Sequence, residues 1–160
     1  MFGNLPTMAT APTIRISVPG TLRYRGIAVR AVAESARLVS GSTVRDPNDP
    51  LVDDVRHPFD TAVVSAFMEI FNNVAIHAYR RKGGGMIDIA ITATDADLLV
   101  EVRDTGHPFE LDEASLPEGG MGLHIAKTML DEVTYKPGPP NLWRLYKRLD
   151  APQAATAGRS

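Results

Sequence analysis

Residues 61–79 read TAVVSAFMEIFNNVAIHAY, and the rest of the fold can be predicted around this stretch. At about 100° per residue in an α-helix, its large apolar residues gather on one side, which predicts a helix with one core-facing side. These residues are Val63, Val64, Phe67, Phe71, Val74 and Ala78. The opposite side carries Glu69, Asn72 and Asn73 among small residues, and Glu69 is the only formally charged residue of the stretch. A side that faces water usually carries several charges, so we expect this one to be covered by something that needs room, an acid and amide oxygens.

The composition of the whole chain narrows the class of protein. The 160 residues suffice for one domain with a full core. The net charge of -2 argues against a general basic surface for nucleic acid, and the absence of cysteine excludes disulfides and thiolate metal sites. The chain has no run of about 18 apolar residues, and residues 1–13 lack the pattern of a signal peptide. We therefore expect a cytoplasmic domain that neither enters a membrane nor binds nucleic acid directly.

The hydrophobic periodicity predicts an alternation of helices and strands. Two segments with alternating β-branched residues, 86–94 and 98–104, read as a hairpin across Asp95-Ala96-Asp97. The predicted strands are 13–19, 86–94, 98–104, 132–136 and 142–149, and the predicted helices are 21–39, 61–79 and 121–133. We expect an α+β fold, a two-layer α/β sandwich with a mixed, mostly antiparallel sheet and helices on one face. One domain would span 13–149, between disordered termini at 1–12 and 150–160.

Two segments outside the central helix have two interpretations each. Four arginines follow the first predicted helix, and they form either a basic face in contact with water or a docking surface for an acidic protein. They are Arg23, Arg25, Arg30 and Arg37. The connection 41–58 is rich in Pro and Asp and is long for an irregular loop in a compact domain, which makes it either mobile or functional.

The spacing Glu69-x-x-x-Asn73 is the first of three patterns that suit chemistry. Four residues turn a helix by about 400°, so the two side chains lie on one face, one turn apart. A carboxylate there can orient an attacking hydroxyl or take its proton. An amide oxygen there can complete a Mg²⁺ shell made otherwise of water and phosphate oxygens. The same spacing arises by chance in many helices, so alone it does not establish a site.

The second pattern is Asp104-x-Gly106-x-Pro108 at the end of a predicted strand. A carboxylate that leaves a strand can accept a hydrogen bond from an exocyclic amine such as that of adenine. Gly106 has no Cβ, so a flat ring can approach the backbone, and Pro108 stiffens the exit. The same three residue types are also common in ordinary turns, which is the alternative explanation.

The third pattern is Gly119-Gly120-Met121-Gly122 at the start of a predicted helix. Glycine-rich backbone ahead of a helix offers N–H groups and the positive end of the helix dipole to a phosphate. The alternative is a flexible loop that precedes a helix by chance. A dinucleotide-binding fingerprint is excluded, because the glycines follow a long acidic loop rather than a strand and no βαβ unit surrounds them.

Together and in this order, the three patterns resemble the GHKL ATP-binding fold of histidine kinases, DNA gyrase and MutL. Within that group, the short chain looks like the bacterial anti-sigma factor serine kinases of the RsbW and SpoIIAB type. The matching text is EIFNNVAIHAY at 69–79, VEVRDTGHPF at 100–109 and EGGMGLHIAKTMLDEV at 118–133. The resemblance covers roughly residues 13–149, although the first 60 residues match only in their strand-then-helix layout.

The resemblance implies roles for the polar residues of the first two motifs. Glu69 would be the general base or would position the attacking group, and Asn73 would be the ligand of Mg²⁺ between the phosphates. Asp104 would hold the amino group of adenine, with Gly106 beside the ring.

The resemblance also implies nucleotide contacts from the last motif and from one histidine. Gly120 and Gly122 would form the lid over the phosphates, with Met121 and Leu123 as further contacts at the start of the helix. His77 would pack or hydrogen-bond near the ribose or the phosphates.

One departure from the pattern concerns charge. Relatives often place a basic residue just before the second glycine box, where this chain has Pro117-Glu118, and no lysine or arginine lies between Arg103 and Lys127. Charge compensation for the γ-phosphate would then come from Mg²⁺, backbone N–H groups, Lys127 or a partner.

The resemblance implies a regulatory protein kinase that binds ATP and Mg²⁺. It would transfer the γ-phosphoryl group to a Ser or Thr hydroxyl of a STAS-type anti-sigma factor antagonist and would alternately sequester a sigma factor, as a homodimer. The first helix and its arginines would face the partner. The alternative is a nucleotide-gated protein-binding regulator of the same fold without significant kinase activity. A third interpretation is an α+β interaction domain whose motifs are coincidental.

Overall fold

The computed structural model describes residues 11–42, 57–79, 84–109 and 119–150, with backbone only for 119–121. The strands are β1 (Thr13–Pro19), β2 (Met86–Ala93), β3 (Asp97–Asp104), β4 (Glu132–Lys136) and β5 (Asn141–Arg148). The helices are a 3₁₀ turn (Leu22–Tyr24), α2 (Arg25–Ser40), α3 (Pro58–Asn73), a π-helical turn (Val74–Ala78) and α4 (Gly119–Met129). The predicted disordered termini and most of the connection 41–58 lie outside the described residues.

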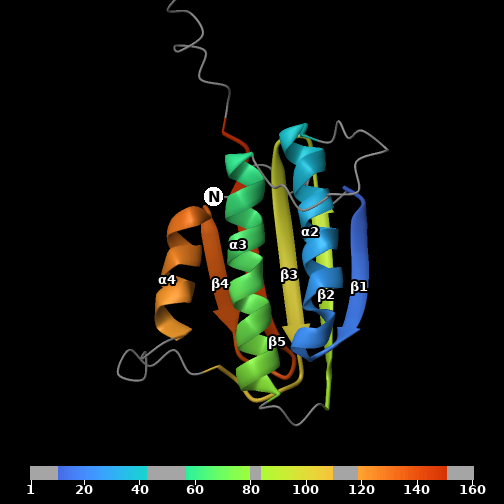
Figure 1. Ribbon diagram of the computed structural model, residues 1–160, viewed down its shortest axis with the longest axis vertical. Coiled ribbons are helices and arrows are strands. Elements are labelled where there is room, and N and C mark those ends of the chain that lie inside the picture. Colours follow the sequence, from blue (N-terminus) through green and yellow to red (C-terminus); the bar gives the residue numbers. More distant parts are fainter. Residues whose placement is uncertain (1–10, 43–56, 80–83, 110–118, 151–160) are drawn as a thin grey trace, which may run out of the picture.

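The five strands form one sheet in the order β1-β2-β3-β5-β4, and α2, α3 and α4 cover one face of it (Figure 1). The expected α+β sandwich with helices on one face is confirmed. Every pair of neighbouring strands among the described residues is antiparallel, so the parallel component of the expected mixed sheet does not occur there. The hairpin of β2 and β3 forms as predicted, and β5 then pairs with β3 along its full length.

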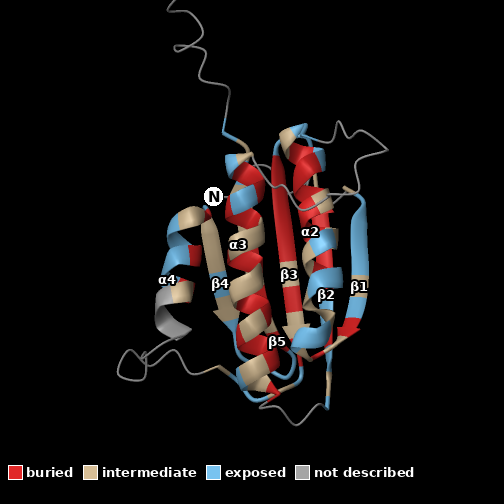
Figure 2. Cartoon of the chain, in the orientation of Figure 1, coloured by how far each residue is buried: buried red, intermediate tan, exposed pale blue. Residues whose placement is uncertain are grey.

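The core lies between the sheet and the helices, and α3 is its centre. Phe67, Ile70 and Phe71 of α3 have no exposed surface. They pack with alternate residues of the inner strands, among them Ile89 and Trp143, in one continuous cluster. Figure 2 shows the buried residues concentrated on α3, α2 and the central strands. The alternation of the core residues along each inner strand follows from the period of two of a β-strand.

The central helix begins earlier than the apolar periodicity suggests. Pro58 is its first residue, where the missing N–H costs no hydrogen bond, and Nδ1 of His57 accepts from the N–H of Phe59 at 3.1 Å. By length and composition alone, the 21 residues Pro58–Ala78 could cross a membrane, although most of their most apolar part is buried inside the domain. Such burial is the property of a core helix.

The end of α4 also differs from the prediction. The periodicity predicts a helix over 121–133, whereas α4 begins at Gly119 and ends at Met129. The N–H of Asp131 donates to the carbonyl of Tyr146 at 3.1 Å, so the chain has already joined the sheet there. The helix ends because the backbone of Asp131 pairs with β5 instead. The hydrophobic periodicity of residues 121–133 cannot predict this pairing.

Candidate nucleotide-binding site

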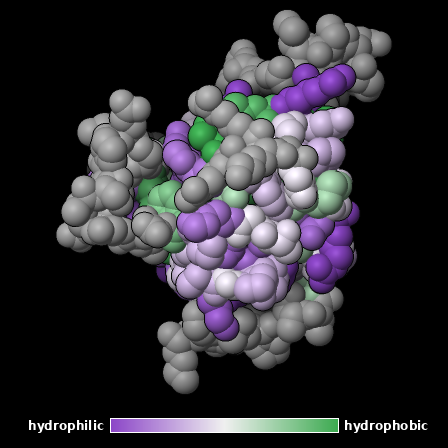
Figure 3. All heavy atoms as spheres, turned by 90° about the horizontal axis from the view of Figure 1, so that it is seen from below, coloured by the Kyte–Doolittle hydropathy of each residue, from purple (hydrophilic) through white to green (hydrophobic). Residues whose placement is uncertain are grey.

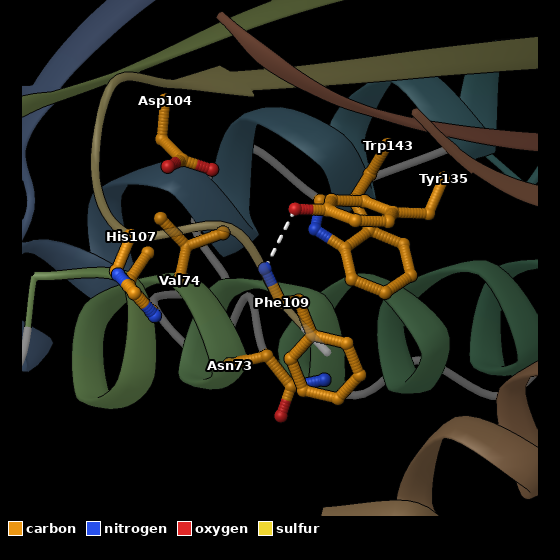
Figure 4. A pocket seen from close by; sticks show the side chains of 8 residues that line it. Asn73, Val74, Asp104, His107, Phe109, Tyr135 and Trp143 are labelled. Carbon is orange, nitrogen blue, oxygen red and sulfur yellow. Dashed lines mark hydrogen bonds between the residues drawn. The ribbon is translucent and has the colours of Figure 1, made fainter. Parts of the chain in front are cut away.

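A pocket lies where the π-helical turn after α3 meets the end of β3. Its space, including the open mouth, is about 190 Å³. The lining residues come from α3 and its π-helical turn, from the end of β3 and the loop after it, and from β4 and β5 (Figure 4). They are Asn73, Val74, Ala78, Asp104, His107, Phe109, Tyr135 and Trp143. Asn73 and Asp104, predicted from separate motifs, are therefore brought to one pocket.

Asp104 is the acid of this pocket, and its side chain is held rigidly. Only 2% of the residue is exposed. Its Oδ1 accepts the backbone N–H of Gly106 and the Nδ2–H of Asn141, each at 2.9 Å. Burial raises the pKa of this carboxyl above its ordinary value of 3.8, and the two hydrogen bonds offset part of that rise. A fixed carboxylate in an apolar pocket is a strong and directional acceptor.

Asn141 is a site residue that sequence reasoning missed. It is 1% exposed and sits directly opposite Asp104 in the pairing of β3 with β5. Its Nδ2 also donates to the carbonyl of Gly106 at 3.0 Å, and its Oδ1 accepts the N–H of Gly138 at 2.9 Å. Asn141 thus binds both ends of the Asp104–Gly106 turn. The sequence shows it only as a polar residue directly before the predicted strand 142–149.

Gly106 has no room for a side chain, because its backbone packs closely against another part of the protein. A Cβ at this position would lie 2.5 Å from the carbonyl oxygen of Ala78. The next residue, His107, donates its N–H to the same carbonyl at 2.7 Å. The loop after β3 is therefore docked on the π-helical turn, and any bound base would meet a loop that is already in place.

Asn73 lies at the edge of the pocket with an unsatisfied polar group. The residue is 6% exposed, and its Nδ2 has no hydrogen-bond partner among the described residues. A buried donor without a partner is costly, and an oxygen of a ligand would satisfy it. The carbonyl end of the same amide is a hard oxygen ligand of the kind that Mg²⁺ prefers. No group of three His, Cys, Asp or Glu that could hold a metal ion occurs among the described residues, so a cation here would depend on phosphate oxygens and water.

Glu69 lies one turn before Asn73, at the contact between α3 and α4. It is half-buried, and a Cβ on Gly122 would overlap its carboxylate. Gly122 is therefore close to Glu69, as a catalytic site built from both motifs requires. Leu123 is 4% exposed and packs in the core, so a ligand could meet only its backbone. Gly120 and Met121 form the first turn of α4, and their side-chain surroundings lie outside the described structure.

Two other polar residues of the central stretch lie outside the pocket lining. His77 is exposed, and its ring meets Phe109 edge-on, with centroids 6.4 Å apart. It stands at the rim, so contact with a ribose or phosphate remains a prediction. Oδ1 of Asn72 accepts from Nη1 of Arg25 at 2.8 Å and ties α2 to α3.

Three aromatic rings form a wall of the pocket. Phe109 meets Trp143 at a centroid distance of 5.6 Å, and Trp143 meets Tyr135 at 4.4 Å (Figure 4). The backbone N–H of Phe109 donates to the Tyr135 hydroxyl at 2.7 Å. Burial also raises the pKa of Tyr135. Flat apolar rings beside a fixed carboxylate suit a planar heterocycle with an exocyclic amine. Phe109 follows β3, whereas Tyr135 and Trp143 lie on β4 and β5, which is why no motif contains all three.

Figure 3 shows the molecule from below the view of Figure 1. The described surface visible there is mostly hydrophilic or neutral, with some apolar patches.

The family model for the histidine kinase-like ATPase domain matches residues 22–143. The chain belongs to this family. Among curated proteins it is similar to the anti-sigma F factor of Bacillus velezensis, with 28% identity over 101 residues, which are 57% of this chain and 66% of that protein. It is also similar to the serine-protein kinase RsbW of the same organism, with 26% identity over 134 residues and 75% of each chain covered. The RsbW of Bacillus subtilis is 30% identical over 82 residues, which are 42% of this chain and 51% of that protein.

Membership of the histidine kinase-like ATPase family agrees with the motifs. The resemblance to anti-sigma factor kinases of the GHKL group is confirmed at the level of the family and of the relatives' names. The ATPase domain implies ATP as the nucleotide. The roles of the individual residues stay predictions, although the fold places Asn73 with Asp104 and Glu69 with Gly122.

Proposed function

We propose that the protein is an ATP-dependent serine/threonine kinase and anti-sigma factor. It would phosphorylate a STAS-type anti-sigma factor antagonist and would bind a sigma factor when that antagonist is unavailable for binding. The observation that carries the proposal is the Asp104 carboxylate, fixed by Gly106 and Asn141 beside three aromatic rings. The names of the relatives supply the partner classes, a sigma factor and a kinase substrate.

The base and the phosphates of ATP would occupy different parts of the site. Asp104 accepts from the adenine amino group while the aromatic wall contacts the ring. The triphosphate runs from there along α3 towards Glu69 and the first turn of α4. Mg²⁺, held by the Asn73 amide oxygen and the phosphates, would neutralise charge on the transferred group.

Phosphoryl transfer then needs an acceptor hydroxyl beside Glu69. The hydroxyl oxygen forms a bond to the γ-phosphorus as the bond from that phosphorus to the bridging β–γ oxygen breaks, and Glu69 takes the hydroxyl proton. The positive end of the α4 dipole faces the phosphates and offers backbone N–H groups to them. These groups and the Mg²⁺ would replace the basic residue that is missing before the second glycine box.

The partner would dock on the outer face of α2. Ile27 and Leu38 of α2 are 59% and 61% exposed, and Arg23 is exposed in the 3₁₀ turn before the helix. Arg37, in contrast, is buried and pairs with Glu34. Exposed apolar side chains with an arginine at one end suit an acidic protein surface. We further propose a homodimer in the cytoplasm, without direct contact to nucleic acid or membrane.

A second function is favoured by the contact between α4 and Glu69. The backbone of Gly122 packs against the Glu69 carboxylate, which limits the room for an acceptor hydroxyl. A nucleotide-gated binding regulator would need no such access, because ATP occupancy alone could select the partner.

The two functions are separated by incubating the protein with labelled ATP, Mg²⁺ and a candidate STAS domain. A kinase transfers label, and Glu69→Gln abolishes transfer while ATP still binds. Glu132→Gln, at a half-buried residue of β4 that does not line the pocket, is the matched control and should transfer label normally. ATP binding without transfer to any candidate would favour the regulator, and failure to bind ATP would contradict both.

A further inference from the structure

Tyr79 follows the π-helical turn directly and has no role in the site described above. Its residue surface is 8% exposed. The hydroxyl donates to the carbonyl of Met86 at 2.6 Å and accepts from the backbone N–H of Thr105 at 3.1 Å. Thr105 lies between Asp104 and Gly106, so the hydroxyl binds the middle of the turn that forms one side of the pocket.

The ring of Tyr79 is fixed by two glycines. A Cβ on Gly20 or on Gly85 would overlap the ring. The two glycines are joined to each other, since the N–H of Gly20 donates to the carbonyl of Gly85 at 2.8 Å. The ring therefore sits where the end of β1 and the start of β2 meet, and the position of its hydroxyl is determined by both strands.

The neighbouring residue holds the other side of the same loop. The carbonyl of Ala78 accepts the N–H of His107, and Gly106 packs on the Ala78 backbone. Residues 78 and 79 thus bind the loop on both sides of Gly106. A core tyrosine needs only its ring for packing, whereas this hydroxyl makes two backbone hydrogen bonds, one of them to the loop that carries the proposed adenine contacts.

We propose that Tyr79 is the positioning residue of the Asp104–Gly106 turn. Its hydroxyl orients the Thr105 peptide, and through it the Asp104 carboxylate, so that base recognition depends on a residue that does not line the pocket. The proposal rests on the proposed nucleotide site.

The test uses Tyr79→Phe, which keeps the ring and removes the acceptor of the Thr105 N–H. The matched control is Tyr146→Phe. It removes a hydroxyl that donates to Oδ2 of Asp97 at 2.8 Å, at the opposite end of β3 from Asp104. Tyr79→Phe loses two side-chain hydrogen bonds and Tyr146→Phe loses one, and both variants are expected to have a lower Tm.

The first measurement is amide hydrogen exchange in the nucleotide-free protein. In Tyr79→Phe, the amides of residues 105–107 should exchange about tenfold faster than in the wild type, because the Thr105 N–H has lost its acceptor and the turn is held less firmly. In Tyr146→Phe they should exchange at the wild-type rate. Equal exchange of these amides in the two variants would overturn the proposal.

The second measurement is the Kd for ATP and for GTP. Tyr79→Phe should weaken ATP binding by about tenfold and should reduce the preference for ATP over GTP, which a merely structural loss of stability would not change. A wild-type Kd and preference in Tyr79→Phe would overturn the proposal. If the wild type binds neither nucleotide, the proposed function fails, and the exchange measurement still decides whether Tyr79 positions the turn.

Discussion

At the scale of single residues, Asp104 shows a conflict between stability and binding. Burial raises the pKa of its carboxyl, so the folded protein holds the proton more tightly than the unfolded chain does. The stability linked to this group is therefore fully present below the unfolded value of 3.8 and is lost as the pH rises through the folded pKa. At neutral pH the ionised, buried carboxylate lowers the stability of the fold. A role of this charge in ligand binding would explain why it is present.

The first prediction concerns Asp104→Asn. The new amide oxygen can accept from Gly106 and Asn141 as Oδ1 does now, so packing is kept while the buried charge is removed. We expect a higher Tm than the wild type at about pH 7 and a difference that shrinks as the pH falls towards 3.8. ATP binding should be strongly weakened, because an NH₂ group would face the adenine amine. Thermal unfolding across this pH range is the measurement, and a variant less stable than the wild type at neutral pH would contradict the account.

At the scale of elements, the packing of α4 on α3 depends on one glycine. Gly122 lies inside α4, where alanine would normally add about 0.5–1 kcal/mol of stability. The nearest atoms to the added Cβ all belong to the flexible Glu69 side chain, which can rotate away. The fold can therefore accept the change, but the carboxylate cannot stay where it is.

The second prediction follows from this contact. Gly122→Ala should unfold at a urea concentration within the range of the wild type and should bind ATP, yet transfer label to the partner at least about tenfold more slowly. Thr128→Ala, at an exposed position of the same helix α4, is the control and should leave transfer unchanged. Normal transfer by Gly122→Ala would show that the observed position of Glu69 has no part in catalysis.

Elements were easier to predict from the sequence than their ends and partners. The strand 13–19 and the hairpin of β2 and β3 follow from local alternation, and the structure has them at the predicted places. The sheet order is not local, because β5 pairs with β3 across 37 positions from Asp104 to Asn141. For the same reason Asn141 was missed, while Asn73 and Asp104 were found in motifs of a few residues each. Gly106 was predicted because a flat ring could approach its backbone, whereas the structure shows it packed against the Ala78 carbonyl.

At the scale of the whole molecule, the site ties distant parts of the chain into one cooperative unit. The pocket joins the end of α3, the end of β3, and β4 with β5. Tyr79 adds the end of β1 and the start of β2. A ligand that contacts all of these should stabilise the domain as a whole, because it binds only the native arrangement.

The last prediction is a thermal shift of the whole domain by ATP. At a concentration of about 100 times the Kd, linkage gives about 2.7 kcal/mol, which in a chain of this size raises the Tm by roughly 5–10 °C. Asp104→Asn should start from a higher Tm and show little of this shift, since it loses the adenine contact but none of the fold. Inorganic triphosphate with Mg²⁺ separates base from phosphate recognition and should give a smaller shift, the same in both proteins. An equal rise in Tm by ATP in the wild type and in Asp104→Asn would mean that adenine binds elsewhere. The pocket beside Asn141 would then have no assigned ligand.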